Sequence, residues 1–156
     1  MARIAVLTVS DRAFRGEYED RGGPACEAWL RGVITSEVEI LRQITPDGRV
    51  EVAAALRDLA DTWGADLILA TGGTGPAPRD QTPEAMADVI TMELAGFGEA
   101  MRAANSRVVA TAILSRQSAG VRGKTLIITL PGSPNAISTS LEAIFAAVPY
   151  CLDLIG

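Results

Sequence analysis

The chain alternates between apolar runs and polar, glycine-bearing segments, and four of the apolar runs predict β-strands. They cover residues 3–9, 38–44, 66–71 and 124–130. Most of them are nearly continuous in aliphatic residues, a pattern typical of strands that are covered on both faces. A shorter run at 111–116 is expected to add another strand.

Between the strands, apolar side chains recur three or four residues apart, which predicts helices. Thr82 and Ser133 each precede a proline and are expected to cap the helices that follow them. Residues 10–23 are expected to form a long loop. The helices are expected to start at Pro24, to span 48–63, to follow residue 82, to resume after a break at 95–99, to span 134–148 up to Pro149, and to end the chain.

This alternation predicts an α/β fold, in which a mostly parallel sheet carries helices on both faces. Ligands of such sheets bind beyond the carboxyl ends of the strands. Four loops leave these ends, and each carries Gly or Pro with a polar side chain: 10–23, 45–48, 72–82 and 131–136. Because the chain has 156 residues and no internal repeat, we expect a single domain over residues 1–156.

Charge and cysteine content narrow the classes of function. The net charge of −5 argues against nucleic acid and anionic membranes as partners, because both need a basic surface. No window approaches the roughly 20 apolar residues of a membrane helix, and the apolar N-terminal run is too short for a signal sequence. Cys26 and Cys151 lack CxxC spacing and are expected to be free thiols of a cytoplasmic protein. Since the chain has no histidine, acid, base or metal-binding work falls to Asp, Glu, Cys or Tyr.

The segment ATGGTGPAPRD, which follows the third predicted strand, is expected to hold an anion. It is not a Walker loop, since the only lysine of the chain is Lys124, and it is not a dinucleotide fingerprint, since Pro78 stands three residues after Gly75. Glycines allow positive φ and close backbone approach, so the amides of 72–75 can point at an anion. A tight turn needs glycines in any case, but a second turn of the same kind, LPGSPN, strengthens the anion-binding interpretation.

Two aspartates at predicted strand ends are candidates for metal chemistry. For Asp47 the plainer interpretation is an N-cap of the helix over 48–63. For Asp80, beside the glycine loop, it is an ion pair with Arg79 or Arg116. The sharper hypothesis is that both carboxylates meet at one rim and hold Mg²⁺ through oxygen ligands, as in phosphate-transfer sites.

Several stretches of the sequence resemble the MogA/MoaB family of molybdenum-cofactor biosynthesis proteins, and above all its MogA group, the molybdopterin adenylyltransferases. In chain order they are VSDR, TGGTGPAPRDQTPEA, GFGE, AILSRQSAG, RGKTLIITLPGSPNA and VPYCLDLI. The resemblance implies a three-layer αβα sandwich that assembles as a homotrimer. It implies the transfer of AMP from ATP to molybdopterin with Mg²⁺, and contact with the molybdate-insertion enzyme as a further partner.

The resemblance also assigns site residues. The family's two essential aspartates fall on Asp47 and Asp80, which are expected to be catalytic and to bind the metal ion. The expected substrate-binding residues are Ser10, Asp11, Thr71, Gly72, Gly73, Thr74, Gly75, Ser115, Pro131, Gly132, Ser133, Pro134 and Asn135. Two alternatives stay open: a MoaB-like relative that binds molybdopterin without transferring AMP, and a scaffold module of the gephyrin kind. Retention of both aspartates favours the transferase over the first alternative.

Overall fold

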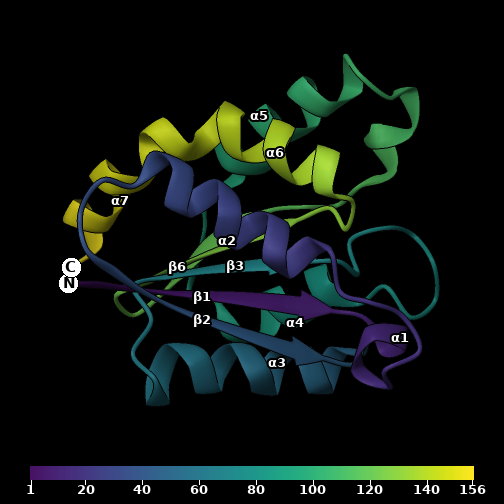
Figure 1. The fold of residues 1–156 in the computed structure, drawn as a ribbon, viewed down its shortest axis with the longest axis horizontal. Helices are drawn as coiled ribbons and strands as arrows, with labels where there is room; N and C mark the ends of the chain where they lie inside the picture. The colour runs from purple at the N-terminus through teal and green to yellow at the C-terminus, as the bar shows by residue number, and fades with distance from the viewer.

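The computed structural model describes all 156 residues, which form one sheet between two layers of helices (Figure 1). Across the sheet the strand order is β2-β1-β3-β6-β5-β4. The first four strands in this order run parallel, whereas β5 is antiparallel to β6 and β4 is antiparallel to β5. The strands are Ala2–Val9 (β1), Val38–Thr45 (β2), Leu67–Thr71 (β3), Met92–Glu93 (β4), Ala119–Arg122 (β5) and Thr125–Leu130 (β6). The expected αβα sandwich with a mostly parallel sheet is confirmed.

The helices are divided between the two faces of the sheet (Figure 1). One face carries α2, α5, α6 and α7, the other carries α3 and α4, and the short α1 lies beside the strand ends. The α-helices are Asp11–Phe14 (α1), Gly22–Val33 (α2), Arg49–Arg57 (α3), Thr82–Val89 (α4), Ala95–Ser106 (α5), Pro134–Ile144 (α6) and Val148–Ile155 (α7). Three short segments complete the helical structure: the π-helix Asp58–Thr62 (η1) and the 3₁₀ helices Ala110–Leu114 (η2) and Phe145–Ala147 (η3).

The central strands send alternate side chains into two separate cores. In β1, Ala5 and Leu7 pack on the side of α3 and α4, whereas Ile4 and Val6 pack on the side of α2 and α6. Strands β3 and β6 divide their side chains in the same way. Because both faces of these strands are buried, their sequences are apolar without alternation, which is why the sequence locates them well.

The expected strand over 111–116 is wrong. These residues lie largely in the 3₁₀ turn η2, where Ile113 is exposed. The place beside β6 is taken instead by β5, because Gly123, with a φ of 57°, makes the tight turn that pairs the two strands. The strand that does pair with β6, AGVR, is short, and its glycine makes it weak as a strand signal.

Three helix boundaries also differ from the sequence expectation. The loop expected over 10–23 contains α1, and α2 already begins at Gly22. Residues 95–99 do not break a helix but form the first turn of α5. Pro149 does not end α6; it lies in the first turn of α7, where a proline removes no helical hydrogen bond.

The helical run Pro134–Ile155 is long and apolar enough, by length and composition alone, to cross a membrane, contrary to the sequence expectation. It spans 22 residues with a mean hydropathy of 1.3. The run consists of α6, η3 and α7, and Ile137, Leu141, Ile144 and Val148 on it are buried in the core. A core helix passes the same test, so this run is weak evidence for a membrane span.

Candidate functional site

The residues expected from the sequence gather at the carboxyl ends of four neighbouring parallel strands. Ser10 and Asp11 follow β1, and Asp47 follows β2. The glycine loop, defined as Thr71–Gly75, ends β3 and continues beyond it, while the segment Pro131–Asn135 follows β6. Because these strands are adjacent in the order β2-β1-β3-β6, the four loops form one continuous rim.

The glycine loop has the backbone geometry that glycine permits. Gly72 and Gly73 have φ angles of 102° and 68°. A Cβ atom on Gly72 would collide with the carbonyl oxygen of Val9, and one on Gly73 with the hydroxyl of Thr82. Gly75 has no positive φ, so the expectation of special backbone geometry is confirmed for the first two glycines only.

Three amides of this loop are free of internal partners. Gly72 donates its N–H to Leu130 O at 3.0 Å, but the N–H groups of Gly73, Thr74 and Gly75 donate no hydrogen bond within the protein. Successive free amides in a turn make a concave site for an anion. The loop therefore has the donors that the sequence analysis expected.

Neighbouring side chains hold the glycine loop in place. Thr71 donates its hydroxyl to Pro131 O at 2.6 Å, which joins this loop to the turn after β6. Thr82 donates its hydroxyl to Gly72 O at 2.9 Å. Thr82 is therefore the first residue of α4 and not its cap, and Gln81 occupies the cap position without a side-chain hydrogen bond. Ser133, in contrast, caps α6 as expected, by accepting the N–H of Ala136.

Arg116 closes the far side of the glycine loop. Its guanidinium donates to Gly75 O at 2.9 Å and to Asp80 O at 2.7 Å, and it pairs with Glu84 at 2.6 Å. The preceding Ser115 shares a 3.2 Å hydrogen bond with the hydroxyl of Thr74. The sequence does not reveal this role of Arg116, because its apolar pattern predicts a strand over 111–116.

Asp47 is turned toward the loop after β1 and does not cap α3. Its carboxylate accepts the N–H of Asp11 at 3.0 Å, while the Asp11 carboxylate accepts the N–H of Asp47 at 3.1 Å. Arg79 completes this link by pairing with Asp11 at 3.0 Å and donating to Asp47 O at 2.8 Å. The cap position of α3 is Gly48, which has no side chain to offer. The N-cap interpretation of Asp47 is therefore wrong.

The electrostatic environments of Asp11 and Asp47 are opposite. The hydrogen bond from Arg79 lowers the pKa of Asp11, so this carboxylate is firmly ionised. Burial raises the pKa of Asp47; the negative charges of Asp11 and Asp80 act in the same direction, and the hydrogen bond from the Asp11 amide opposes them. A carboxylate surrounded in this way has a lower free energy when a cation lies beside it.

Asp80 lies on the other flank of the glycine loop and forms no ion pair. Its carboxylate accepts only the N–H of Ala77, at 3.1 Å, and a Cβ atom on Gly75 would lie 2.9 Å from it. Arg79 and Arg116, the partners that the plainer interpretation gave it, pair with Asp11 and Glu84. That interpretation is wrong, and the Asp80 carboxylate lies beside Gly75 without an ion-pair partner.

The two aspartates fit a Mg²⁺ ion only in part. The structure contains no group of three or more His, Cys, Asp or Glu side chains that could hold a metal ion. Mg²⁺, however, is usually bound by one or two carboxylates together with substrate phosphates and water. The oxygen donors and the negative potential around Asp47 match this mode, in which the protein supplies part of the coordination shell.

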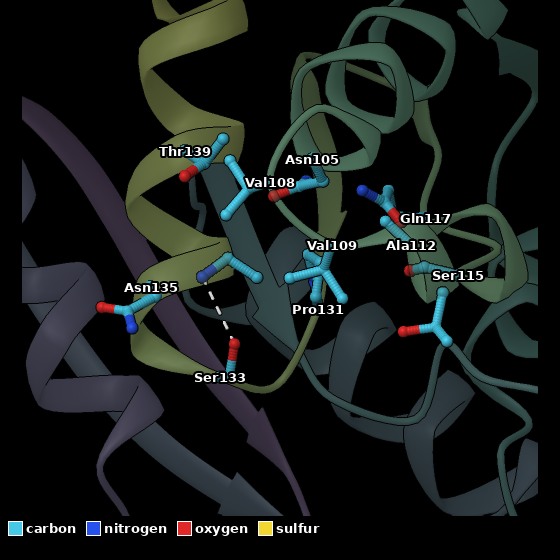
Figure 2. A pocket seen from close by; sticks show the side chains of 12 residues that line it. Asn105, Val108, Val109, Ala112, Ser115, Gln117, Pro131, Ser133, Asn135 and Thr139 are labelled. Carbon is cyan, nitrogen blue, oxygen red and sulfur yellow. Dashed lines mark hydrogen bonds between the residues drawn. The ribbon is translucent and has the colours of Figure 1, made fainter.

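Two cavities flank the segment Pro131–Asn135. The larger, of about 290 Å³, opens beside the glycine loop through Ser115 and includes Ser133 and Asn135 (Figure 2). The smaller, of about 140 Å³, includes Ser10, Thr71, Gly72 and Gly132. Eight of the expected substrate-binding residues are thus divided between two hollows. Asp11, Gly73, Thr74, Gly75 and Pro134 line neither of them, and nor do Asp47 and Asp80.

Comparisons with known proteins identify the family. The sequence profile described as a probable molybdopterin binding domain matches residues 5–150. A Helicobacter pylori protein named molybdopterin adenylyltransferase is 49% identical over 152 residues, covering 97% of this chain and 86% of its own length. The structure of the molybdopterin biosynthesis enzyme MoaB from Thermus thermophilus superimposes with a TM-score of 0.89 at 45% identity, covering 99% of this chain and 96% of that one. The molybdopterin biosynthesis Mog protein from Mycobacterium ulcerans gives a TM-score of 0.89 at 36% identity, with both chains fully covered. The chain belongs to the MogA/MoaB family of molybdopterin-binding proteins.

Proposed function

We propose that this protein transfers AMP from ATP to molybdopterin. Besides the family relationship and the activity named for its relatives, one observation carries the proposal. The free amides of Gly73, Thr74 and Gly75 lie between two carboxylates, Asp47 and Asp80, at the carboxyl edge of the sheet. Backbone amides attract phosphate, whereas carboxylates repel it unless a metal ion lies between them. The combination therefore suits a reaction in which the amides bind phosphate and the carboxylates bind a metal ion.

The chemistry suits a chain without histidine. The terminal phosphate of molybdopterin attacks the α-phosphorus of ATP, a new P–O bond forms, and the bond to the β-phosphate breaks with release of pyrophosphate. The attacking phosphate is already ionised at neutral pH, so no general base has to remove a proton. Positioning and charge stabilisation then provide the catalysis.

The residues of the rim divide this work. The amides of the glycine loop bind a phosphate group, and Arg116 keeps the loop in shape through Gly75 O and Asp80 O. Asp80 and Asp47 are the residues that would hold Mg²⁺, with Asp47 oriented by the amide of Asp11. When bound there, Mg²⁺ neutralises negative charge that builds up on the reacting phosphates.

The larger cavity suits the pterin. It adjoins the glycine loop, since Ser115 both lines the cavity and bonds to Thr74. A ligand with its ring in this cavity can therefore place a phosphate on the loop. Ser10, Asp11 and the residues Pro131–Asn135 complete the proposed substrate site; Ser10 also caps α1 and Asp11 also pairs with Arg79.

We propose further that the chain forms one domain over residues 1–156 and assembles as a homotrimer in the cytoplasm. An apolar groove between the start of α5 and the end of α6, which includes Leu94, Phe97 and Ile144, offers surface for such an assembly. Both cysteines are free thiols, which suits a reducing compartment. Contact with the molybdate-insertion enzyme, which would receive the adenylylated product, belongs to the same proposal.

The proposal is tested by incubating the purified protein with molybdopterin, ATP and Mg²⁺ and separating the pterin products by chromatography. We expect adenylylated molybdopterin together with an equal amount of pyrophosphate. Tight binding of molybdopterin without this product would identify the MoaB-like alternative. A protein that neither binds nor converts molybdopterin would contradict the proposal and leave the scaffold alternative.

A further inference from the structure

Gln117 is a buried polar side chain without a partner. It is 1% exposed, and neither atom of its amide forms a hydrogen bond within the protein. Its backbone carbonyl is satisfied by Arg102 at 2.6 Å, so the segment is held while the side chain is left unpaired. An amide withdrawn from water in this way destabilises the fold, and such a residue in a native protein calls for an explanation.

Gln117 belongs to the wall of the larger cavity, and its amide atoms are buried in that wall. Gln117 lines it together with Asn105, and Figure 2 shows both side chains on the side of the cavity across from Ser133 and Asn135. Asn105 is 5% exposed, and its Nδ2 donates to Met101 O at 3.0 Å and to Ser140 Oγ at 2.8 Å. The bond to Met101 O fixes the orientation of the Asn105 amide: if the amide were flipped, Oδ1 would face the carbonyl oxygen of Met101, and neither atom could donate. Its Oδ1 accepts no hydrogen bond within the protein and is available to a ligand.

Together the two side chains define which ligand fits. Asn105 contributes one acceptor, and the amide of Gln117 contributes one donor and one acceptor. A 2-amino-4-oxopyrimidine edge, as in a pterin, carries two adjacent donors, the 2-amino group and N3–H, followed by one acceptor, O4. Gln117 can pair with N3–H and O4, and Asn105 Oδ1 can accept from the 2-amino group. Adenine matches only the Gln117 part, because it has no amino group at C2.

We propose that Gln117 and Asn105 recognise the 2-amino-4-oxo edge of the pterin, so that the larger cavity selects the pterin over the adenine of ATP. The inference rests on the proposed function, since it takes molybdopterin as the ligand. It adds two specificity-determining residues that the sequence motifs did not single out. It also explains why an unsatisfied glutamine is retained: the ligand completes its hydrogen bonds.

The test is the affinity for molybdopterin, measured by calorimetry without ATP, for wild type and Gln117→Leu. Leucine has a similar volume and leaves no unpaired polar atom, so we expect the melting temperature to stay the same or rise. The affinity should fall about ten- to hundredfold, as expected for the loss of two buried hydrogen bonds to a ligand. Gln43→Leu makes the same change on β2, away from the cavity, and should leave the affinity unchanged.

A second comparison needs no variant and therefore holds even if Gln117→Leu fails to fold. Lumazine carries an oxo group in place of the 2-amino group of pterin, together with a proton on N1. The wild type should bind pterin more tightly, because Asn105 Oδ1 repels the oxo group. Equal binding of the two, or unchanged molybdopterin affinity in a folded Gln117→Leu variant, would overturn the inference. Because these binding measurements contain no ATP, they remain valid even if the protein does not transfer AMP. If Gln117→Leu transfers AMP at the wild-type rate and binds molybdopterin with unchanged affinity, the inference about Gln117 is refuted while the proposed function stands.

Discussion

Replacing Asp80 by asparagine separates a role in catalysis from a role in the fold. The carboxylate of Asp80 makes one hydrogen bond, from the N–H of Ala77 at 3.1 Å, and no ion pair. Asparagine has nearly the same shape and keeps a carbonyl oxygen that can accept this bond. The change therefore removes the negative charge of the side chain and little else.

The two roles predict effects of very different size. Weakening a single half-exposed hydrogen bond costs at most about 1 kcal/mol of the free energy of unfolding, which lowers the melting temperature of a domain of this length by about 2–4 °C. Removing a placed electrostatic contact from the transition state costs about 10²–10³ in rate, or about 2.7–4 kcal/mol. We expect Asp80→Asn to lose about 10²–10³ in the rate of AMP transfer, with little loss of stability. Molybdopterin affinity should be unchanged or higher, because the loop amides remain and a nearby negative charge is gone.

The assay measures AMP transfer at saturating Mg²⁺, molybdopterin affinity and melting temperature on the same preparation. Asp66→Asn is a matched control, because Asp66 also accepts one backbone N–H, from Arg3 at 2.8 Å, but precedes β3 at the opposite edge of the sheet. This control should transfer AMP at the wild-type rate. A folded Asp80→Asn variant with wild-type turnover would refute the role of Asp80, and an activity loss that only follows the loss of folded protein would make it structural.

Three further predictions concern the same rim and the assembly. Gly73→Val should abolish molybdopterin binding, because valine does not readily adopt the φ of 68° that the loop requires and its side chain would collide with the hydroxyl of Thr82. Unchanged affinity of a folded variant, measured by calorimetry, would exclude the anion-binding loop. Asp47→Asn should raise the melting temperature at pH 7 while transfer is lost, because burial raises the pKa of Asp47 and its ionised form destabilises the fold. That gain in stability should shrink as the pH falls through the raised pKa toward the unfolded value of about 3.9, and a gain that persists at lower pH would contradict the assignment. Light scattering at micromolar concentration should give three times the chain mass of 16.3 kDa, and a monomer mass would count against the trimer.

The sequence predicts the framework of this fold because burial on both faces leaves a strong signal. The expected bounds of all four parallel strands agree with the structure to within a residue or two. Burial explains this for the three central strands, such as Leu67–Thr71, which is buried throughout, but not for Val38–Thr45, which lies at the edge of the sheet and is buried only at its last residue. The strand predicted over 111–116 is wrong, because Ile113 and Leu114 are typical strand residues in sequence but are both exposed in the structure. The position beside β6 is occupied by Ala119–Arg122, which a tight turn connects to β6, so residues 111–116 have no strand to pair with there. This constraint is tertiary and leaves no local pattern.

The same limit applies to the site. The sequence predicts that the glycine loop and the two aspartates lie at one edge of the sheet, since the ends of parallel strands meet there, and the structure places them there. The pairing of residues far apart in the chain leaves no local signal: the sequence shows neither that Arg79 pairs with Asp11 nor that Arg116 holds the loop. Gln117 lies within the stretch AILSRQSAG, but only a structure shows that its amide is buried and unpaired.

The most direct test of the central claim follows the label of ATP during one turnover. The protein is mixed in excess with molybdopterin, Mg²⁺ and ATP labelled at either the α- or the γ-phosphorus, and the pterin product is isolated. If the chain transfers AMP, the α-label appears in the pterin and the γ-label leaves as pyrophosphate. Label from the γ-position in the pterin, or no label from either position while the folded protein binds molybdopterin, would contradict the assignment of AMP transfer to this protein.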